Sequence, residues 1–334
     1  MSIEIRSATD DDLDKWDSYV ERSPQSNPFH LRGSLAALAA HADADLHPLI
    51  GFKGQEPVGL LPLFAVERLG VPMAFSPPPE LLIPYLGPAL LNMGKLKRRK
   101  RERRHQHFVD GCIEWLDEHL GPRYTHVRSD YRYTDLRPLE WNRLEASLGH
   151  TYTVDLSAGA DELLQRFSSD ARSNVRDGVP ENCTIEEGGE RAIRRIVTQI
   201  YRRYEAQDKS YGVTPGFVLD LRERLPEGCL RAYVCRVDGR FAGGMITLED
   251  EGTIHRWQGG AKHDAAIPVN DHVDWHVMRE AMERGISSYD LVGADSRRLN
   301  EYKAKFDPDL RTYHEAERAG PVMRLARAAY TRLR

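Results

Sequence analysis

Hydrophobic and polar positions follow the same pattern in two separate stretches of the chain. Residues 47–67 and 231–251 each contain an apolar run, a short polar turn and a second apolar run. The turns contain Gly54 and Gly239, and glycine adopts turn angles that other residues resist. The pattern therefore predicts a β-hairpin in each stretch, with Gly59 and Gly243 at equivalent points.

An amphipathic helix with a glycine near its end, and then a short strand, follow each hairpin. The apolar stripes of the two helices are Val109, Ile113 and Leu116 in one and Val273, Val277 and Ala281 in the other. Further helices are predicted over residues 160–176 and 191–207. The repeated order predicts two tandem α/β domains of similar fold, each with a mixed β-sheet flanked by helices.

The predicted boundaries divide the 334 residues into three parts. Residues 1–148 form an N-terminal domain with a basic insertion near residues 94–105. Residues 149–318 form a C-terminal domain, which we expect to carry the active site. Residues 319–334 form a basic amphipathic helix, a type of segment that docks on its own domain or contacts a membrane surface.

Composition and charge indicate an ordinary soluble protein. Hydrophobic residues make up 40% and charged residues 29% of the chain. Residues 1–150 hold 19 basic and 21 acidic residues and the remainder holds 28 and 30, so neither half is distinctly acidic or basic. Four cysteines without a CxxC spacing and a start without a signal-peptide pattern predict a cytoplasmic protein. The apolar runs are too short for a transmembrane segment.

A local cluster of positive charge lies in residues 95–104, where eight of ten residues are Lys or Arg. Cations at the start of a helix oppose its macrodipole, so a phosphate-bearing partner would explain their placement. Such a partner is tRNA, an anionic lipid head group or a nucleotide-linked acceptor. The alternative is a solvated helix extension. The candidate phosphate-binding residues are Lys97, Arg98, Arg99, Lys100 and Arg101.

Three segments resemble the motifs of one family. Residues 27–29 (NPF) are similar to the family's opening segment, and residues 172–176 (RSNVR) to its "R.NIRKA" segment, although Asp177 and Gly178 depart from it. Residues 289–294 (YDLVGA) and 301–306 (EYKAKF) resemble "YDFGG…EFKxxFG" in sequence and spacing. The chain thus resembles the tandem GNAT-fold proteins related to the Fem peptidyltransferases and a broader group of acetyltransferase-like proteins.

The resemblance implies a transferase that forms an amide on an amine acceptor. The donor would be acyl-CoA or aminoacyl-tRNA, with no permanently bound cofactor and no metal. The acceptor would be a small molecule, a peptide or a lipid-linked amine. Residues 258–268 contain glycines but lack the spacing of the usual phosphate-binding loop for CoA, which leaves the donor open.

Lys303 and Asp295 are the catalytic candidates. Lys303 matches the lysine of the family motif, and a cation there would neutralise a phosphate or stabilise a developing oxyanion. Asp295 follows a strand end, where it would accept the proton of the amine, although it could equally cap the next turn.

The remaining candidates are substrate-binding residues. Arg172 and Arg176 would share a helix face and clamp a phosphate, whereas the alternative is an ordinary charged surface. The other candidates are taken from the family positions or from a strand that could line the acceptor pocket: Asn174, Trp257, Asn270 and Tyr302.

Two hypotheses of other classes compete with the transferase. The first is a catalytically silent GNAT-fold protein that binds nucleic acid or an anionic membrane through the basic segment. The second is a metal-dependent hydrolase, because His272 and His276 have the i, i+4 spacing of zinc ligands. That spacing lacks the glutamate of the metalloprotease motif, with Val273 in its place.

Overall fold

The computed structural model describes residues 3–250, 252–262, 265, 267–294 and 296–320. The chain divides into two compact units. Unit 1 comprises residues up to Gly149 together with those from Thr312 onward, and unit 2 comprises His150–Arg311. The structure therefore places residues 312–318 in unit 1, whereas the sequence assigned them to the second domain. The expected helix over residues 319–334 lies outside the described residues, apart from its first two positions.

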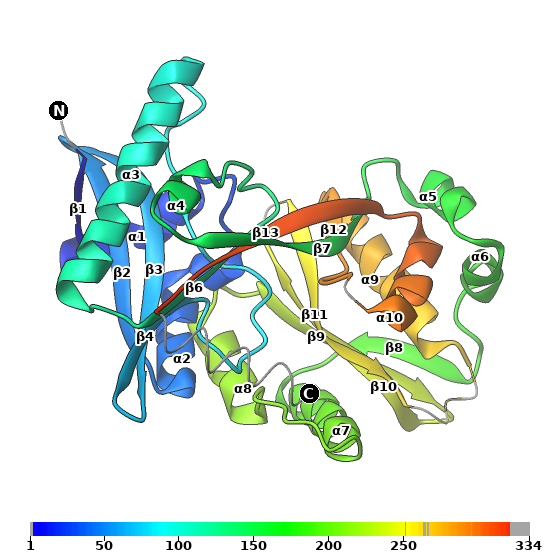
Figure 1. Ribbon diagram of the computed structural model, residues 1–334. Helices are drawn as coiled ribbons and strands as arrows, with labels where there is room; N and C mark the ends of the chain where they lie inside the picture. Colours follow the sequence, from blue (N-terminus) through cyan, green and yellow to red (C-terminus); the bar gives the residue numbers. More distant parts are fainter. Residues whose placement is uncertain (1–2, 251, 263–264, 266, 295, 321–334) are drawn as a thin grey trace. The chain divides into compact units, whose positions relative to one another are not determined.

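Unit 1 is a sheet with helices against it (Figure 1). Its helices are α1 (Asp10–Val20), α2 (Arg32–Ala42), α3 (Arg98–His119) and α4 (Arg137–Trp141), with a short 3-10 turn at Pro28–His30. Its strands are β1 (Glu4–Ser7), β2 (Asp45–Lys53), β3 (Glu56–Arg68), β4 (Val71–Ser76), β5 (Ala89–Leu90), β6 (Tyr124–Ser129) and most of β13 (Asp309–Ala319). The strand order is β1-β2-β3-β4-β6-β13, antiparallel except for β4 and β6, and β5 pairs with β3.

Unit 2 repeats this plan. Its strands are most of β7 (Glu145–Asp155), β8 (Cys183–Glu187), β9 (Leu230–Val237), β10 (Arg240–Glu249), β11 (Thr253–Ala261) and β12 (Ser288–Asp290). Its helices are α5 (Ala160–Arg166), α6 (Ser169–Val175), α7 (Glu190–Glu205), α8 (Pro215–Arg224), α9 (Val269–Glu283) and α10 (Arg297–Lys303), followed by a 3-10 turn at Ala304–Phe306. The strand order is β8-β9-β10-β11-β12-β7, antiparallel except for β11 and β12.

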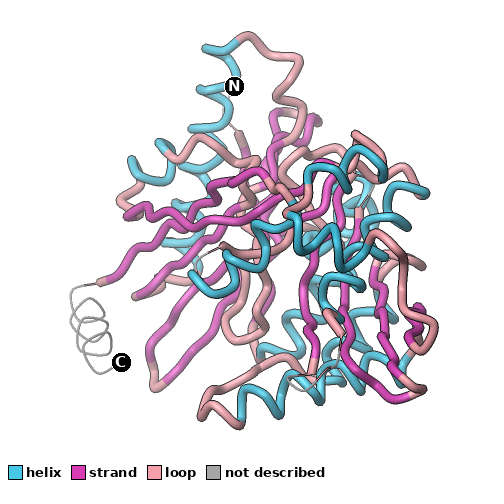
Figure 2. Tube along the Cα trace, turned by 90° about the vertical axis from the view of Figure 1, so that its right-hand side faces the viewer, coloured by secondary structure: helices cyan, strands magenta, loops and turns pink. Residues whose placement is uncertain are grey.

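Glycines in the second strand of each hairpin let a helix approach the sheet. A Cβ on Gly59 would lie 2.8 Å from the Phe108 ring of α3, and a Cβ on Gly243 would lie 2.9 Å from Val269 of α9. A Cβ on the next residue, Gly244, would lie 2.6 Å from Ile196 of α7. Because successive strand residues point to opposite faces, α7 and α9 cover opposite faces of this sheet. Figure 2 shows helices flanking the strands.

Several predictions of local structure are confirmed. The hairpins are β2–β3 and β9–β10, and the two amphipathic helices are α3 and α9. The single helix expected over residues 160–176 is wrong. The chain leaves the helical conformation at Phe167, and the Ser168 hydroxyl then accepts a hydrogen bond from the backbone N–H of Ala171 at the start of α6. A serine with this N-cap role begins a new helix.

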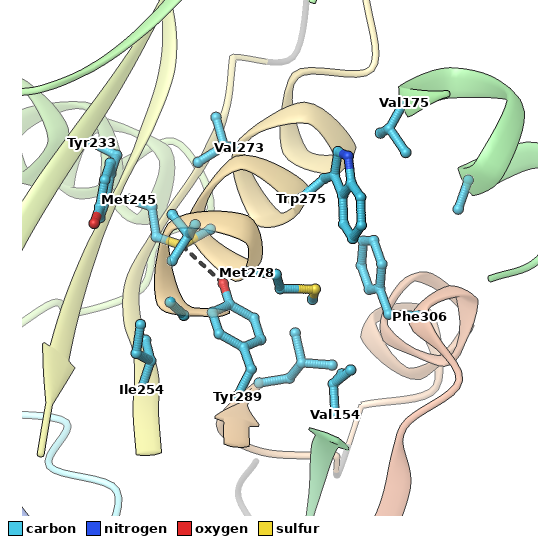
Figure 3. Packing of buried hydrophobic residues seen from close by; sticks show 14 of the residues in the cluster. Val154, Val175, Tyr233, Met245, Ile254, Val273, Trp275, Met278, Tyr289 and Phe306 are labelled. Atoms are coloured by element: carbon cyan, nitrogen blue, oxygen red, sulfur yellow. Dashed lines mark hydrogen bonds between the residues drawn. The ribbon is translucent and has the colours of Figure 1, made fainter. Parts of the chain in front are cut away.

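The core of unit 2 fills the space between its sheet and α9 (Figure 3). Tyr289, on β12, is fully buried, and its hydroxyl lies 3.2 Å from the sulfur of Met245 on β10. Phe167 packs edge-on against both Trp275 and Phe306, which joins α9 to the segment after α10. None of the helices among the described residues has the length and apolar character to cross a membrane.

Candidate functional site

The two parallel strands of unit 2 are paired over only three residues. Their ladder joins residues 253–255 of β11 to residues 288–290 of β12. Beyond it, β11 continues to Ala261, while the backbone N–H groups of Leu291 and Ala294 donate to carbonyls of residues 152 and 150 on β7. The chain after β12 therefore follows β7 and not β11. In open α/β sheets, ligands bind beyond the carboxyl ends of such strands.

Lys303 lies at this strand end. The side chain is buried, and its ammonium donates to the carbonyls of Val292 at 2.8 Å and Gly293 at 2.6 Å. Both carbonyl residues have positive φ, 51° for Val292 and 83° for Gly293. A β-branched residue rarely adopts this conformation, and such strain is concentrated at functional sites. The structure thus places a buried positive charge at the end of β12.

A buried polar network lies beside Lys303 and is centred on Asp274 of α9. One carboxylate oxygen accepts hydrogen bonds from Arg256 Nε at 2.7 Å and the Tyr289 hydroxyl at 2.6 Å. The other accepts a bond from the Tyr302 hydroxyl at 2.5 Å. Burial and the negative charge of Asp274 raise the pKa of Tyr302 well above its usual value. Tyr302, a predicted substrate-binding residue, thus holds α10 against α9 through its hydroxyl.

A second buried polar network is centred on Asp290, the last residue of β12. Asp290 accepts hydrogen bonds from the Thr151 hydroxyl at 2.6 Å and from the backbone N–H of Val292 at 2.8 Å. The other Asp290 oxygen lies 3.4 Å from Nδ1 of His255. Burial alone would lower the pKa of His255, but its contacts with Asp250 and Asp290 outweigh burial and raise the pKa to about 9.

Sequence analysis did not single out Asp274, His255 or Asp290 as parts of a site. Two of them were visible as charged or ionisable residues in predicted strands, but only the register of β11 and β12 brings His255 opposite Asp290. Asp274 is fully buried on α9, between Val273 and Trp275 in the sequence. A polar residue at a core-facing helical position is the signal that could have found it.

Asn174 and Asn270 both make structural contacts at the start of α9. Asn174 Nδ2 donates to Asp271 at 2.6 Å, which links α6 to α9, and burial raises the pKa of Asp271. Asn270 Oδ1 accepts a bond from the backbone N–H of Ala261 at 2.8 Å, which ties α9 to the end of β11. Lys305 lies 2.7 Å from Asp170 and 3.8 Å from Asp271.

The predicted arginine pair does not converge on one point. Arg172 donates to the carbonyl of Gln165, and Arg176 pairs with its neighbour Asp177. Trp257 is buried on β11, and its ring meets Phe217 of α8 edge-on at 5.8 Å between centroids. Asp295, the proposed proton acceptor, lies outside the described residues.

The basic segment forms the N-terminal part of α3 in unit 1, which projects beyond the strands in Figure 1. Arg98 and Arg101 line a cavity of about 630 Å³, whereas Lys97, Arg99 and Lys100 do not. Arg98 pairs with Glu102 at 3.0 Å. The wall also contains His105, whose pKa burial lowers to about 4.

The histidine pair of α9 is not part of a metal-binding group in the described residues. His276 Nε2 lies 3.1 Å from Glu280, and burial lowers the pKa of His272.

Comparisons with known proteins show a similarity between unit 2 and one family. The model of the acetyltransferase (GNAT) domain family matches residues 164–304, a segment that includes Asp274, Asp290 and Lys303. The matched segment lies within unit 2. No curated protein matches the sequence.

Solved structures extend the GNAT-like fold to the rest of the chain. A structure of FemX has a TM-score of 0.71 at 13% identity and covers 93% of this chain and 96% of its own. L-PGS from Bacillus licheniformis has a TM-score of 0.58 at 12% identity, with 98% of each chain covered. A tandem GNAT protein of the clavulanic acid biosynthesis pathway has a TM-score of 0.55 at 13% identity, with 96% of this chain and 99% of its own covered. The tandem GNAT-like fold predicted from the sequence is thereby confirmed.

Proposed function

We propose that unit 2 is the catalytic unit of a cytoplasmic transferase that forms an amide on an amine acceptor. The donor is acyl-CoA or aminoacyl-tRNA, and the acceptor is a peptide, a lipid-linked amine or a small molecule. The observation that carries the proposal is the buried ammonium of Lys303 on the carbonyls of Val292 and Gly293, inside the GNAT domain.

The reaction requires a neutral amine to attack the carbonyl carbon of a thioester or ester. A C–N bond forms, the C–S or C–O bond to the donor breaks, and the amine loses a proton. Negative charge develops on the carbonyl oxygen, and a fixed cation in a site with little water stabilises it strongly. Lys303 supplies that cation, and Asp295 takes the amine proton.

The relatives support this class of chemistry. The matching family is named for acetyl transfer, and the tandem GNAT structure is described as one without AcCoA, which implies an acyl-CoA ligand for that protein. FemX and L-PGS share the fold with this chain over more than nine tenths of its length. The extent of these matches favours a transferase that uses both units over a single GNAT domain with an unrelated appendage.

The test is a turnover assay with acetyl-CoA or a set of aminoacyl-tRNAs as donor and a panel of amines as acceptors. We expect Lys303→Ala to reduce kcat by about 10²–10³-fold, the cost of losing one group that stabilises an oxyanion. Release of the CoA thiol or deacylation of the tRNA, each dependent on the amine, measures the rate.

Lys305→Ala is the matched control, because Lys305 lies two residues on and pairs with exposed Asp170. It should change kcat only a few-fold. Equal losses in the two variants, or a Lys303→Ala variant as active as the wild type, would overturn the catalytic assignment. Binding of donors without any turnover would favour the silent GNAT-fold alternative.

A further inference from the structure

A second cavity lies in unit 2. Its lining includes several cations and no acidic side chain. Its volume is about 480 Å³, and it lies between α7 and the turn that joins β9 to β10. The basic lining residues come from four segments: Arg191 and Arg195 of α7, Arg236 of β9, Arg240 of β10, and Lys262 directly after β11.

Four of these five cations have no carboxylate partner within 4 Å among the described residues. Only Arg236 has one, Glu186 at 3.0 Å on β8. Elsewhere on α7 the exposed arginine Arg194 is paired with Glu190 one turn earlier. Like charges at i and i+4 on a helix, as in Arg191 and Arg195, destabilise it. The cluster therefore costs stability when it is empty.

Phe241 holds two of the cations over the cavity. The guanidinium carbon of Arg195 lies 5.2 Å from the centre of its ring, and the ammonium of Lys262 lies 6.0 Å from it. Phe241 is itself buried and lines the cavity together with Ala192 and Val234. These contacts hold two cations at the same ring and occupy it, so the site is suited to anionic groups more than to a stacked base.

We propose that this cavity binds clustered phosphate groups of the donor substrate. This proposal rests on the proposed transferase function. The cavity holds the donor in a chain whose loop after β11 lacks the usual glycine spacing. Side-chain cations from α7 and the β9–β10 turn replace the backbone N–H groups of that loop. Phosphate is favoured over carboxylate because five cations surround one cavity, which matches a ligand with several negative charges.

The experiment measures binding by calorimetry, without turnover, to three probes: inorganic pyrophosphate, CoA and a short RNA hairpin. The test variant is the triple substitution Arg195→Gln, Arg240→Gln and Lys262→Gln, in which all three side chains are exposed. We expect its affinity for the bound probe to fall at least about 30-fold. If the probe is RNA, the slope of log K against log salt should fall by about 2–3.

Two variants serve as controls. Arg194→Gln removes a neighbouring arginine that does not line the cavity and should leave binding unchanged. The double substitution Arg195→Lys and Arg240→Lys keeps the charge and should retain most of the affinity. All variants should melt within about 2 °C of the wild type, because the substituted side chains are on the surface.

The outcomes separate the sources of phosphate. Binding of pyrophosphate and CoA that the triple variant loses supports the site and a CoA donor, whereas the same loss with RNA alone supports the site and a tRNA donor. Unchanged binding in the triple variant, an equal loss in Arg194→Gln, or no binding of any probe overturns the proposal. Lys303→Ala should retain binding while it loses turnover, so failure of the catalytic assignment is recognised separately.

Discussion

At the scale of single residues, the best-defined feature is the burial of charge beside β12. Asp274 is fully buried and is paired with Arg256, which is itself largely buried. Two tyrosine hydroxyls complete the shell of donors around the carboxylate. A buried ion pair of this kind adds little net stability over an apolar pair, but removal of one partner leaves a buried charge unpaired.

Asp274→Ala should therefore lower the free energy of unfolding by about 3–5 kcal/mol. Urea denaturation followed by tryptophan fluorescence measures the change, since Trp275 is the next residue on α9. Glu190→Gln is the control, because it removes the carboxylate of an exposed pair with Arg194 and should cost less than about 1 kcal/mol. A loss of similar size in both variants would mean that the network contributes no more than a surface pair.

At the scale of elements, the packing of helices on each sheet depends on glycines inside strands. Gly244 of β10 is one crowded example, because a Cβ there would lie 2.6 Å from the carbonyl oxygen of Tyr233 as well as from Ile196. A backbone atom in a paired strand cannot move aside cheaply, so a methyl group at this position forces β10 and β9 apart.

Gly244→Ala should lower the free energy of unfolding by about 2–3 kcal/mol, as for overpacking elsewhere. Gly216 offers a matched control, since it lies in α8 and a Cβ there would come no closer than 3.8 Å, to Thr214 Oγ1. Gly216→Ala should raise stability by up to about 1 kcal/mol, because alanine favours the helix. Thermal unfolding of the two variants gives the comparison, and a Gly244→Ala variant as stable as the wild type would contradict the packing argument.

The sequence predicted those parts of the fold that depend on local pattern. The two hairpins have turn glycines and alternating apolar residues, and the amphipathic helices α3 and α9 have clear apolar stripes. The break between α5 and α6 was missed because the apolar residues on both sides of Phe167 suit one continuous helix, and only the capping by Ser168 separates them. Contacts between separate elements, such as that of Lys303 with Val292, could not be predicted from a local pattern of residues.

At the scale of the whole molecule, the chain returns to unit 1 after it has formed unit 2. Each sheet has the same order, but β7, which follows the elements of unit 1, pairs with β12 of unit 2. Conversely, β13 follows the elements of unit 2 and pairs with β6 of unit 1 through His314–Ala319. The sequence placed β13 up to residue 318 in the second domain because position along the chain gives no sign of a returning strand. Only unit 1 therefore depends on a segment that follows all the elements of the other unit.

Two truncations test whether unit 1 needs the returning strand β13. Removal of residues 309–334 deletes β13 and leaves β6 with an open edge, so we expect the backbone amides of residues 124–129 that pair with β13 to exchange hydrogen at least about 100-fold faster. Removal of residues 321–334 keeps β13 and should leave these amides protected. Ion pairs such as Arg128 with Glu315, 2.8 Å apart across the two strands, would be lost only in the longer truncation. Equal protection in both truncated chains would show that unit 1 closes its sheet without the returning strand.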